Sequence, residues 1–286
     1  MPIEVRNVSL IYNEGTPFET KALDNVSFKI EDGEFVGIMG HTGCGKSTMM
    51  QLIDGLIEPS AGEIIIDGKN ISDPGYDRGE LRRNVGMVFQ YPECQLFETT
   101  VEKDVAFGLK HSGLPAEEIA DRVKWSLEML GFEYERIRKK SPLGFSGGEK
   151  RRIAIAGILA AKPKALLLDE PIAGLDPLGR ADFLTLLQTL NEQGTTIVMI
   201  SHNADCIGQC AKRVIVFEQG RTVLDGTTAE VFSDTEKMKS LHLSVGQSRE
   251  LANLLAENGL PMPDGLTKYD ELRSAVICCF GKETAQ

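Results

Sequence analysis

A glycine-rich stretch of the sequence has the composition needed to hold a chain of phosphates. Residues 40–48 read GHTGCGKST, which fits the pattern G-x-x-x-x-G-K-[ST] between an apolar run and a predicted helix. Glycines let backbone N–H groups turn inward around phosphates, and the helix that starts at Lys46 adds the positive end of its dipole. We expect Lys46 to reach the β- and γ-phosphates of a nucleotide and the Ser47 hydroxyl to coordinate Mg²⁺. The predicted nucleotide contacts in this loop are Gly40, His41, Thr42, Gly43, Cys44, Gly45, Lys46, Ser47 and Thr48.

Two adjacent carboxylates lie at the end of another apolar run. Asp169 and Glu170 follow residues 165–168, and 123 residues separate Lys46 from Asp169. An aspartate at a strand end holds Mg²⁺ through water in phosphate-loop proteins. The next carboxylate points out of the strand, where it can polarise a water that attacks the γ-phosphate. We therefore predict Asp169 as a magnesium ligand and Glu170 as the catalytic carboxylate.

Two further polar residues follow predicted strands. Gln90 ends the strand predicted for 84–89, and His202 follows the strand predicted for 195–200. Strands of a parallel sheet end on the same edge, where ligands bind, so both side chains are expected to converge on the γ-phosphate. We predict that Gln90 senses Mg²⁺ and the attacking water, and that His202 contacts the γ-phosphate and holds the water in position.

The elements that must position these residues are predicted from the apolar pattern. Alternation near the N-terminus indicates half-buried antiparallel strands, continuous apolar runs indicate buried strands, and spacings of three and four indicate helices. Strands alternating with helices imply a parallel sheet covered on both faces. The predicted strands cover 3–10, 23–30, 35–39, 62–71 (with a turn at 67–68), 84–90, 165–169, 195–200 and 213–217, and the predicted helices 46–54, 101–131, 146–161, 177–192 and 203–210. The fold class is α/β, with a parallel core sheet, an antiparallel β subdomain, a helical subdomain and a small C-terminal extension.

The composition excludes several classes of protein. The 286 residues carry 42 acidic and 31 basic side chains, a net charge of −11, which argues against a nucleic-acid backbone as the main partner. No apolar run approaches the roughly 18 residues that span a bilayer, and the N-terminus has no secretory signal. Six scattered cysteines predict free thiols. We expect a protein that stays inside the cell.

The order of the motifs resembles that of one large family. Residues 145–152, FSGGEKRR, open a predicted helix and resemble the signature motif, usually LSGGQ, of ATP-binding cassette (ABC) ATPases. With the phosphate loop, Gln90, Asp169–Glu170, the AGLD of 173–176 and the SH of 201–202, the motifs of that family occur in family order over about residues 3–232. The resemblance implies ATP hydrolysis with Mg²⁺ by a P-loop NTPase fold. It also implies a head-to-tail pair of ATPases in which each signature motif contacts ATP on the other subunit. The residues expected to contact ATP in trans are Ser146, Gly147, Gly148 and Asp176, and Tyr12 is expected to stack on adenine.

Finer features resemble one branch of this family. Residues 90–98, QYPECQLFE, followed by TVEKDV at 100–105, are similar to the corresponding region of energy-coupling factor (ECF) transporter ATPases, and 15–19 with 40–43 resemble the second of the two ATPases in such a module. The resemblance implies import of vitamins or transition-metal ions such as cobalt or nickel. It implies as partners a second ABC ATPase (as a heterodimer in preference to a homodimer), a transmembrane T component and substrate-binding S components. Residues 91–98 would line the groove for the T component's helices, with the protein peripheral on the cytoplasmic side of the cell membrane.

The chain departs from the family pattern at two signature positions. Glu149 replaces the usual glutamine and adds negative charge near an anion site, so we expect its carboxylate to point away from phosphate. Phe145 replaces the usual leucine. Cys44 lies inside the phosphate loop beside a helix N-terminus, where a thiolate is favoured. We therefore expect its alkylation to block ATP hydrolysis and bound nucleotide to protect it, although Cys44 as a tolerated small residue is the alternative.

Other functions compete with the ECF interpretation. A conventional ABC importer or exporter shares all the chemistry and differs in its membrane partner. A soluble ABC ATPase acting on DNA or ribosomes is disfavoured by the single cassette, by the acidic charge and by the short span between Lys46 and Asp169. A regulatory protein that binds nucleotide without hydrolysis is disfavoured by Glu170 and His202. We divide the chain into an ATPase domain (1–234), with a helical subdomain at about 95–160, and an extension (235–286) that we expect to be a dimerisation element.

Overall fold

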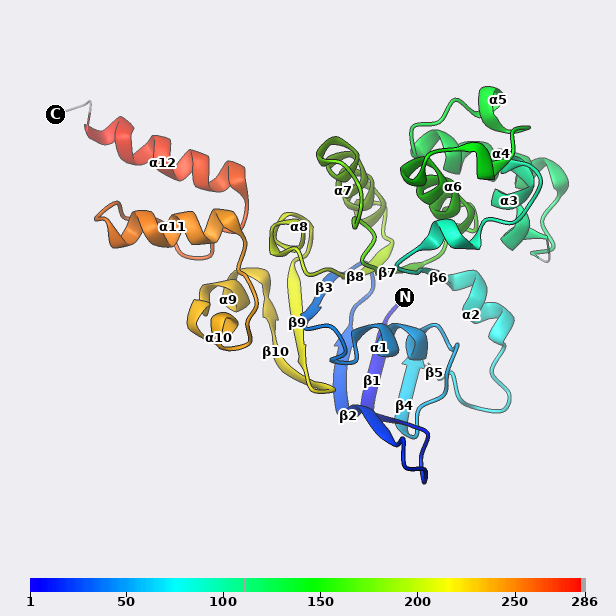
Figure 1. The fold of residues 1–286 in the computed structure, drawn as a ribbon, viewed down its shortest axis with the longest axis horizontal. Helices are drawn as coiled ribbons and strands as arrows, with labels where there is room; N and C mark the ends of the chain where they lie inside the picture. The colour runs from blue at the N-terminus through cyan, green and yellow to red at the C-terminus, as the bar shows by residue number, and fades with distance from the viewer. Residues whose placement is uncertain (111, 284–286) are drawn as a thin grey trace.

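The computed structural model of the chain describes residues 1–110 and 112–283, with only the backbone described for 280–283 (Figure 1). Six strands form its central sheet in the order β10-β9-β3-β8-β7-β6. All neighbouring strands are parallel except β9 and β10, so the predicted parallel core sheet is confirmed, and the antiparallel edge strand β10 was not predicted. The bounds are β3 (Phe35–Gly40), β6 (Val85–Val88), β7 (Ala165–Asp169), β8 (Thr196–Ile200), β9 (Arg213–Glu218) and β10 (Arg221–Thr227).

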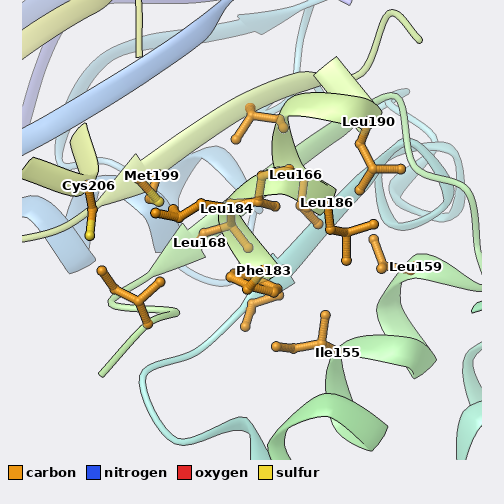
Figure 2. Packing of buried hydrophobic residues seen from close by; sticks show 14 of the residues in the cluster. Ile155, Leu159, Leu166, Leu168, Phe183, Leu184, Leu186, Leu190, Met199 and Cys206 are labelled. Carbon is orange, nitrogen blue, oxygen red and sulfur yellow. The ribbon is translucent and has the colours of Figure 1, made fainter. Parts of the chain in front are cut away.

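Both faces of this sheet are buried, which explains the continuous apolar runs of its strands. Along β7, Leu166 and Leu168 pack into one hydrophobic cluster, whereas Ala165 and Leu167 pack into a second cluster on the opposite face. The first cluster includes side chains of the helices α6 (Gly147–Leu159) and α7 (Pro177–Glu192), and Figure 2 shows these side chains meeting over β7 and β8. The second cluster includes α1 (Lys46–Ile53) and the N-terminal strands. The sheet is therefore held from both sides, and the ends of its strands are fixed in place.

The N-terminal strands form a separate antiparallel sheet, as predicted. Its order is β2-β1-β4-β5. The short hairpin between β4 and β5 turns at Asp67 and Gly68, which both have positive φ (52° and 78°), as a tight two-residue turn requires. The bounds are β1 (Ile3–Tyr12), β2 (Thr20–Ile30), β4 (Ala61–Ile66) and β5 (Lys69–Asn70).

Helices and short 3₁₀ turns occupy the chain between β6 and β7. The long helical run predicted for 101–131 is wrong in its continuity, because Gly113 adopts a positive φ of 75° and Pro115 precedes the next helix. Helix α2 (Arg78–Asn84), which comes just before β6, was not predicted. The elements of this part are η1 (Pro92–Gln95), α3 (Val101–Val105), η2 (Phe107–Leu109), α4 (Ala116–Met129), α5 (Tyr134–Ile137), η3 (Pro142–Gly144) and α6.

The C-terminal part is helical, as its sequence pattern indicates. Helix α8 (Ala204–Cys210) lies between β8 and β9, and four helices follow β10: α9 (Thr228–Ser233), α10 (Thr235–Ser240), α11 (Gln247–Glu257) and α12 (Tyr269–Glu283). α11 and α12 lie side by side and share a small hydrophobic cluster, at the opposite end of the molecule from α3–α6 (Figure 1). Residues 284–286 of the predicted extension lie outside the described residues. Within the described residues, every helix is too short or too polar to cross a bilayer.

Candidate active site

The phosphate loop connects the buried strand β3 to helix α1. Gly40 ends the strand with φ of 143°, and a Cβ there would lie 2.3 Å from the backbone oxygen of Phe217. Only glycine fits this close approach between β3 and β9. The Lys46 Nζ turns back into the loop and donates to the carbonyl oxygens of Gly40 (2.7 Å) and His41 (2.6 Å). The loop is therefore closed around the ammonium group that is expected to meet phosphate.

The loop forms one wall of a cavity of about 410 Å³ at the carboxyl end of the central sheet. The cavity lies where a parallel sheet is expected to bind its ligand. It brings together residues from four separate segments that the sequence analysis predicted to converge. The lining residues are Gly40, Thr42, Gly43, Lys46, Ser47, Gln90, Asp169, Glu170, Ile200 and His202.

Glu170 has an unusual backbone conformation. Its φ is 49°, a left-handed value that costs a non-glycine residue roughly 1–2 kcal/mol. Its Oε1 accepts a hydrogen bond from the backbone N–H of His202 (2.9 Å) and lies 2.9 Å from the His202 Nδ1. The other oxygen, Oε2, is buried and has no hydrogen-bond partner within the described residues. One carboxylate oxygen is therefore fixed, and the second is buried without a partner of its own within the described residues.

Three oxygen donors line the part of the cavity next to Lys46. Asp169 is the last residue of β7 and is 8% exposed, and Ser47 lies in the first turn of α1. Gln90 lies two residues beyond the end of β6 at Val88, so the strand predicted for 84–90 is shorter than expected. A hydroxyl, a carboxylate and an amide oxygen are the donors that Mg²⁺ accepts when substrate phosphates supply the remaining ligands. These residues fit a magnesium ion that arrives with a nucleotide.

Tyr12 lies at the end of β1, opposite Thr20 at the start of β2. Its side chain is partly exposed (38%) and does not line the phosphate cavity. The phosphate loop packs against the same end of β2, because a Cβ on Gly45 would lie 2.7 Å from the Ala22 oxygen. Tyr12 thus lies at the same end of the N-terminal sheet as the part of β2 that the phosphate loop contacts, and its stacking on adenine stays a prediction.

The signature segment forms a second cavity, of about 500 Å³. Ser146 is the N-cap of α6, and Asp176 is the N-cap of α7, where it accepts from the Gly179 N–H (2.7 Å). Ser146, Gly148 and Asp176 line this second cavity and do not line the phosphate cavity. The residues predicted to contact ATP in trans are therefore grouped together, away from the phosphate loop of their own chain.

Glu149 does not turn away from the signature serine. Its Oε2 accepts from the Ser146 N–H (2.9 Å) and from the Ser146 hydroxyl (2.7 Å), which forms a capping box. The expectation that this carboxylate points away from the anion site is wrong, because the N–H groups at a helix N-terminus attract an acidic residue at the third position. For Ser146 to donate its hydroxyl proton to phosphate, it must first release Glu149.

Two contacts at the site were missed from the sequence. The guanidinium of Arg151, on α6, donates to backbone carbonyls around the phosphate cavity. The His41 Nε2 lies 2.5 Å from the Leu241 carbonyl oxygen, and the His41 ring is 6.0 Å from that of His242, so the phosphate loop contacts the segment after α10. Both contacts join residues far apart in the sequence. The only sequence signal for the Arg151 contact was the run of basic residues at 150–152.

Comparison with known proteins agrees with this geometry. The sequence pattern of the ABC transporter family matches residues 23–173. The energy-coupling factor transporter ATP-binding protein EcfA2 of Clostridium perfringens is 47% identical over 278 residues, which cover 97% of this chain and 98% of that protein. The chain belongs to the ABC transporter family. The family and the P-loop α/β fold expected from the motifs are both confirmed.

Solved structures of ABC proteins have the same fold. The cbiO1 protein of Clostridium perfringens, part of the ABC transporter complex cbiONQ, is 36% identical with a TM-score of 0.73, covering 88% of this chain and 98% of that chain. The ABC cassette MJ0796, in a dimer bound to ADP and phosphate, is 33% identical with a TM-score of 0.70, covering 79% of this chain and 98% of its own. This ABC transporter subunit therefore has an ATP-binding cassette fold, with its phosphate loop and its signature segment in separate cavities.

Proposed function

We propose that this chain is the ATP-hydrolysing subunit of an energy-coupling factor importer for vitamins or transition-metal ions. The observation that supports the hydrolytic part is the position of Glu170 at the cavity formed by the phosphate loop, with Oε1 held by the His202 N–H and Oε2 unpaired within the described residues. The similarity to EcfA2 over nearly the full length of both proteins supports the importer branch over a conventional ABC transporter.

ATP binding begins with its phosphates in the loop of residues 40–48. The Lys46 ammonium leaves the carbonyls of Gly40 and His41 for the β- and γ-phosphates, a stronger charged acceptor. Ser47, Gln90 and Asp169 would hold Mg²⁺, which when bound neutralises charge on the phosphate oxygens. The ring of Tyr12 stacks on adenine.

Hydrolysis then needs a water aligned with the γ-phosphate. Oε2 of Glu170 takes a proton from this water as its oxygen attacks phosphorus, and the bond to the β-phosphate oxygen breaks to give ADP and phosphate. Oε1 stays bonded to the His202 N–H, so the carboxylate keeps its orientation. The Nδ1 of His202 lies 2.9 Å from this Oε1 and the side chain is 77% exposed, so Nε2 is the ring nitrogen that would reach the γ-phosphate.

The signature cavity completes the site of a second ATPase. Ser146, Gly147 and Gly148 present a helix N-terminus to the γ-phosphate held by the partner, and Asp176 lies at the same interface. Grouping of these residues away from the phosphate loop supports head-to-tail pairing, as does the likeness to a dimeric cassette bound to ADP and phosphate. A second ABC ATPase is the proposed partner, in a heterodimer.

An exposed aromatic cluster supports contact with a membrane subunit. Tyr91 is 60% exposed and Phe97 is 61% exposed. The Phe97 ring packs edge-on against the Phe107 ring, with 4.7 Å between the ring centroids. We propose that residues 91–98 receive helices of the T component, with the S components binding the transported substrate. This places the chain at the cytoplasmic side of the cell membrane.

The C-terminal extension presents a second exposed apolar surface. Leu251 and Leu254 on α11, with Tyr269 and Ile277 on α12, are between 46% and 66% exposed. We propose that this surface contributes to pairing of the two ATPases, in the role expected for residues 235–286.

The test is purification of the tagged chain from detergent-solubilised native membranes, with co-purifying subunits identified by mass spectrometry. We expect a second ABC ATPase, one T-type membrane protein and several S-type proteins. Phe97→Glu should lose the membrane subunits but keep ATP binding, whereas the equally drastic Phe18→Glu, at a residue 79% exposed beyond β1, should keep both. Recovery of two permeases with a solute-binding protein, or of no membrane protein, would contradict the importer assignment.

A further inference from the structure

Arg151 is a buried cation that the hydrolysis steps above do not use. It lies in the second turn of α6, five residues after the N-cap Ser146, and is only 5% exposed. Its guanidinium donates to three backbone carbonyls: to Gln90 at 2.6 Å, to Glu170 at 3.0 Å and to Ala173. One side chain thus bonds to the backbone at three separate places.

These carbonyls belong to two segments beside the phosphate cavity, one after β6 and one after β7. Gln90 follows β6, Glu170 follows β7, and Ala173 lies in the loop that leads to Asp176 and α7. Within the second segment the Ala173 N–H also donates to the Glu170 carbonyl (3.3 Å), so Arg151 joins this turn to the segment after β6. The guanidinium has five N–H donors in a fixed planar fork, so it can hold several acceptors at once in one geometry.

The strained backbone of Glu170 is held at both of its polar groups. Its N–H donates to the Ile200 carbonyl (3.1 Å), and its C=O accepts from Arg151. The direction of a side chain follows from the φ and ψ of its residue, so a relaxed Glu170 would point its Oε2 elsewhere. The carbonyl bond from Arg151 therefore acts on the position of the carboxylate.

Charged residues near the Arg151 guanidinium include one in the segment 91–98, which is proposed to bind the membrane subunit. Burial lowers the pKa of Arg151, while the carboxylates of Glu93 and Glu170 oppose this by favouring its charged form. Glu93 lies in η1, within residues 91–98, and its Oε2 is buried without a hydrogen-bond partner in the described part of the chain. Arg151 lies between this segment and the hydrolytic carboxylate.

We propose that Arg151 is a positioning residue for ATP hydrolysis, which holds the Glu170 carboxylate in its productive orientation by clamping the backbone carbonyls of Gln90, Glu170 and Ala173. The inference rests on the proposed role of Glu170 as the hydrolytic carboxylate. In this role Arg151 acts through backbone carbonyls, and it also borders the signature cavity, where the partner's ATP is proposed to bind.

Two substitutions of Arg151 distinguish the effect of its three carbonyl hydrogen bonds from the effect of its positive charge. Arg151→Lys keeps the charge but offers one nitrogen instead of a planar fork, and Arg151→Gln keeps an amide donor without the charge. We expect both variants to bind ATP within threefold of the wild-type affinity. The single-turnover rate of the full-length chain, with protein in excess over ATP, should fall at least 30-fold in both. Restoration of the wild-type rate by lysine would show that charge alone matters and would overturn the clamp.

The matched control is Arg122→Lys. Arg122 is another partly buried arginine of the helical region, and it donates to Glu118 and to the Ala161 carbonyl (3.3 Å), away from the phosphate cavity. The Arg122→Lys variant should lose about as much thermal stability as Arg151→Lys, but its turnover rate should equal that of the wild type. A purely structural Arg151 would behave in the same way as this control, with a rate per folded molecule equal to that of the wild type.

A double-mutant cycle tests whether Arg151 acts through Glu170. If it does, Arg151→Lys combined with Glu170→Gln should be no more than threefold slower than Glu170→Gln alone. An additional 30-fold loss in the double variant would overturn the proposal. Normal turnover in Glu170→Gln alone would instead refute the role of Glu170, so the two failures are distinguishable.

Backbone hydrogen–deuterium exchange provides a test that does not depend on turnover. In Arg151→Lys, amides in peptides covering 90–93, 170–175 and 201–203 should exchange at least tenfold faster, while those of α1 stay unchanged. Faster exchange throughout α6, with these three segments unaffected, would show a general loosening of the helix and contradict the clamp.

Discussion

Replacement of Glu170 by glutamine changes one atom of the proposed hydrolytic site. Glutamine has the size of glutamate, and its amide oxygen can keep the hydrogen bond that Oε1 accepts from the His202 N–H. The amide nitrogen then takes the place of Oε2, the atom without a partner in the described residues. The variant therefore keeps its internal hydrogen bond and loses only the carboxylate oxygen that has no partner within the described residues.

The size of the expected effect follows from this geometry. A positioned general base contributes about 10²–10⁴-fold to a rate, or about 3–5 kcal/mol at 1.36 kcal/mol per factor of ten. ATP affinity should stay equal or become tighter, because a negative charge next to the γ-phosphate is removed. Since no internal hydrogen bond is lost, the melting temperature should stay within about 2 °C of the wild type.

The assay measures phosphate release by the wild type and by Glu170→Gln at saturating ATP, together with binding of ATP and size-exclusion chromatography. We expect turnover to fall at least 100-fold and ATP to remain bound, and the variant should elute as a closed pair when its co-purified partner ATPase is present. Glu31→Gln, at a residue whose side chain is 62% exposed, controls for the loss of one charge. Turnover within tenfold of the wild type, in a variant that binds ATP, would refute the assignment of Glu170.

Three further changes test the phosphate loop and the helix behind it. Gly40→Ala should weaken ATP binding at least 100-fold in equilibrium titration, because its Cβ would collide with the Phe217 oxygen at 2.3 Å. Alkylation at Cys44, with the modified residue identified by mass spectrometry, should block ATP hydrolysis. The alkylation reaction should be slow because Cys44 is only 6% exposed, and bound ATP should slow it further. Burial raises the pKa of Asp54 to about 7 against the opposing effect of Arg82. An unfolded aspartate ionises near pH 4, so the free energy of unfolding of the wild type should fall as pH rises from about 4 to 7. Asp54→Asn cannot ionise, so it should show no such fall and should melt about 5 °C higher than the wild type at pH 8.

Each of these changes has its own control. Gly68→Ala also places alanine at a positive φ (78°) but meets no described atom within 4 Å and lies in the β4–β5 turn, so it should keep full ATP affinity. Full-rate hydrolysis by protein alkylated at Cys44 would contradict the second expectation. For Asp54→Asn, a gain in melting temperature that is the same at pH 4 and pH 8 would show that ionisation is not its cause.

The residues proposed for hydrolysis could be predicted to lie together because each follows a strong local signal. The phosphate loop joins a continuous apolar strand to a helix, and Asp169 with Glu170 ends another such strand, so the parallel sheet brings them to one edge. The same reasoning missed β10, an edge strand whose residues are intermediate or exposed and which includes Asp225 and Gly226. An edge strand has one unpaired side and little apolar signal.

Contacts between distant segments were beyond what periodicity can predict. Arg151 is 61 residues from Gln90 and donates to its backbone, so nothing in the sequence of the acceptor marks the pair. The capping role of Glu149 could have been recognised, because serine followed three residues later by glutamate is the pattern of a capping box.

The position of β3 at the centre of the sheet has a consequence for how the chain folds during synthesis. Its neighbours β8 and β9 pair with it through Phe35–Ile197 and Val36–Arg213, so the first partner residue is 162 positions later. At the usual ribosomal rate of about 5–20 residues per second, the strand waits on the order of 10–30 s with both edges unpaired. All six residues of β3 are buried in the folded protein. Until β8 and β9 have been synthesised, β3 is therefore an exposed apolar strand with unpaired edges, which can pair with other chains. Fragments that end before β8 should therefore be retained by chaperones or aggregate, and cooperative folding should begin only once residues near 217 have left the ribosome.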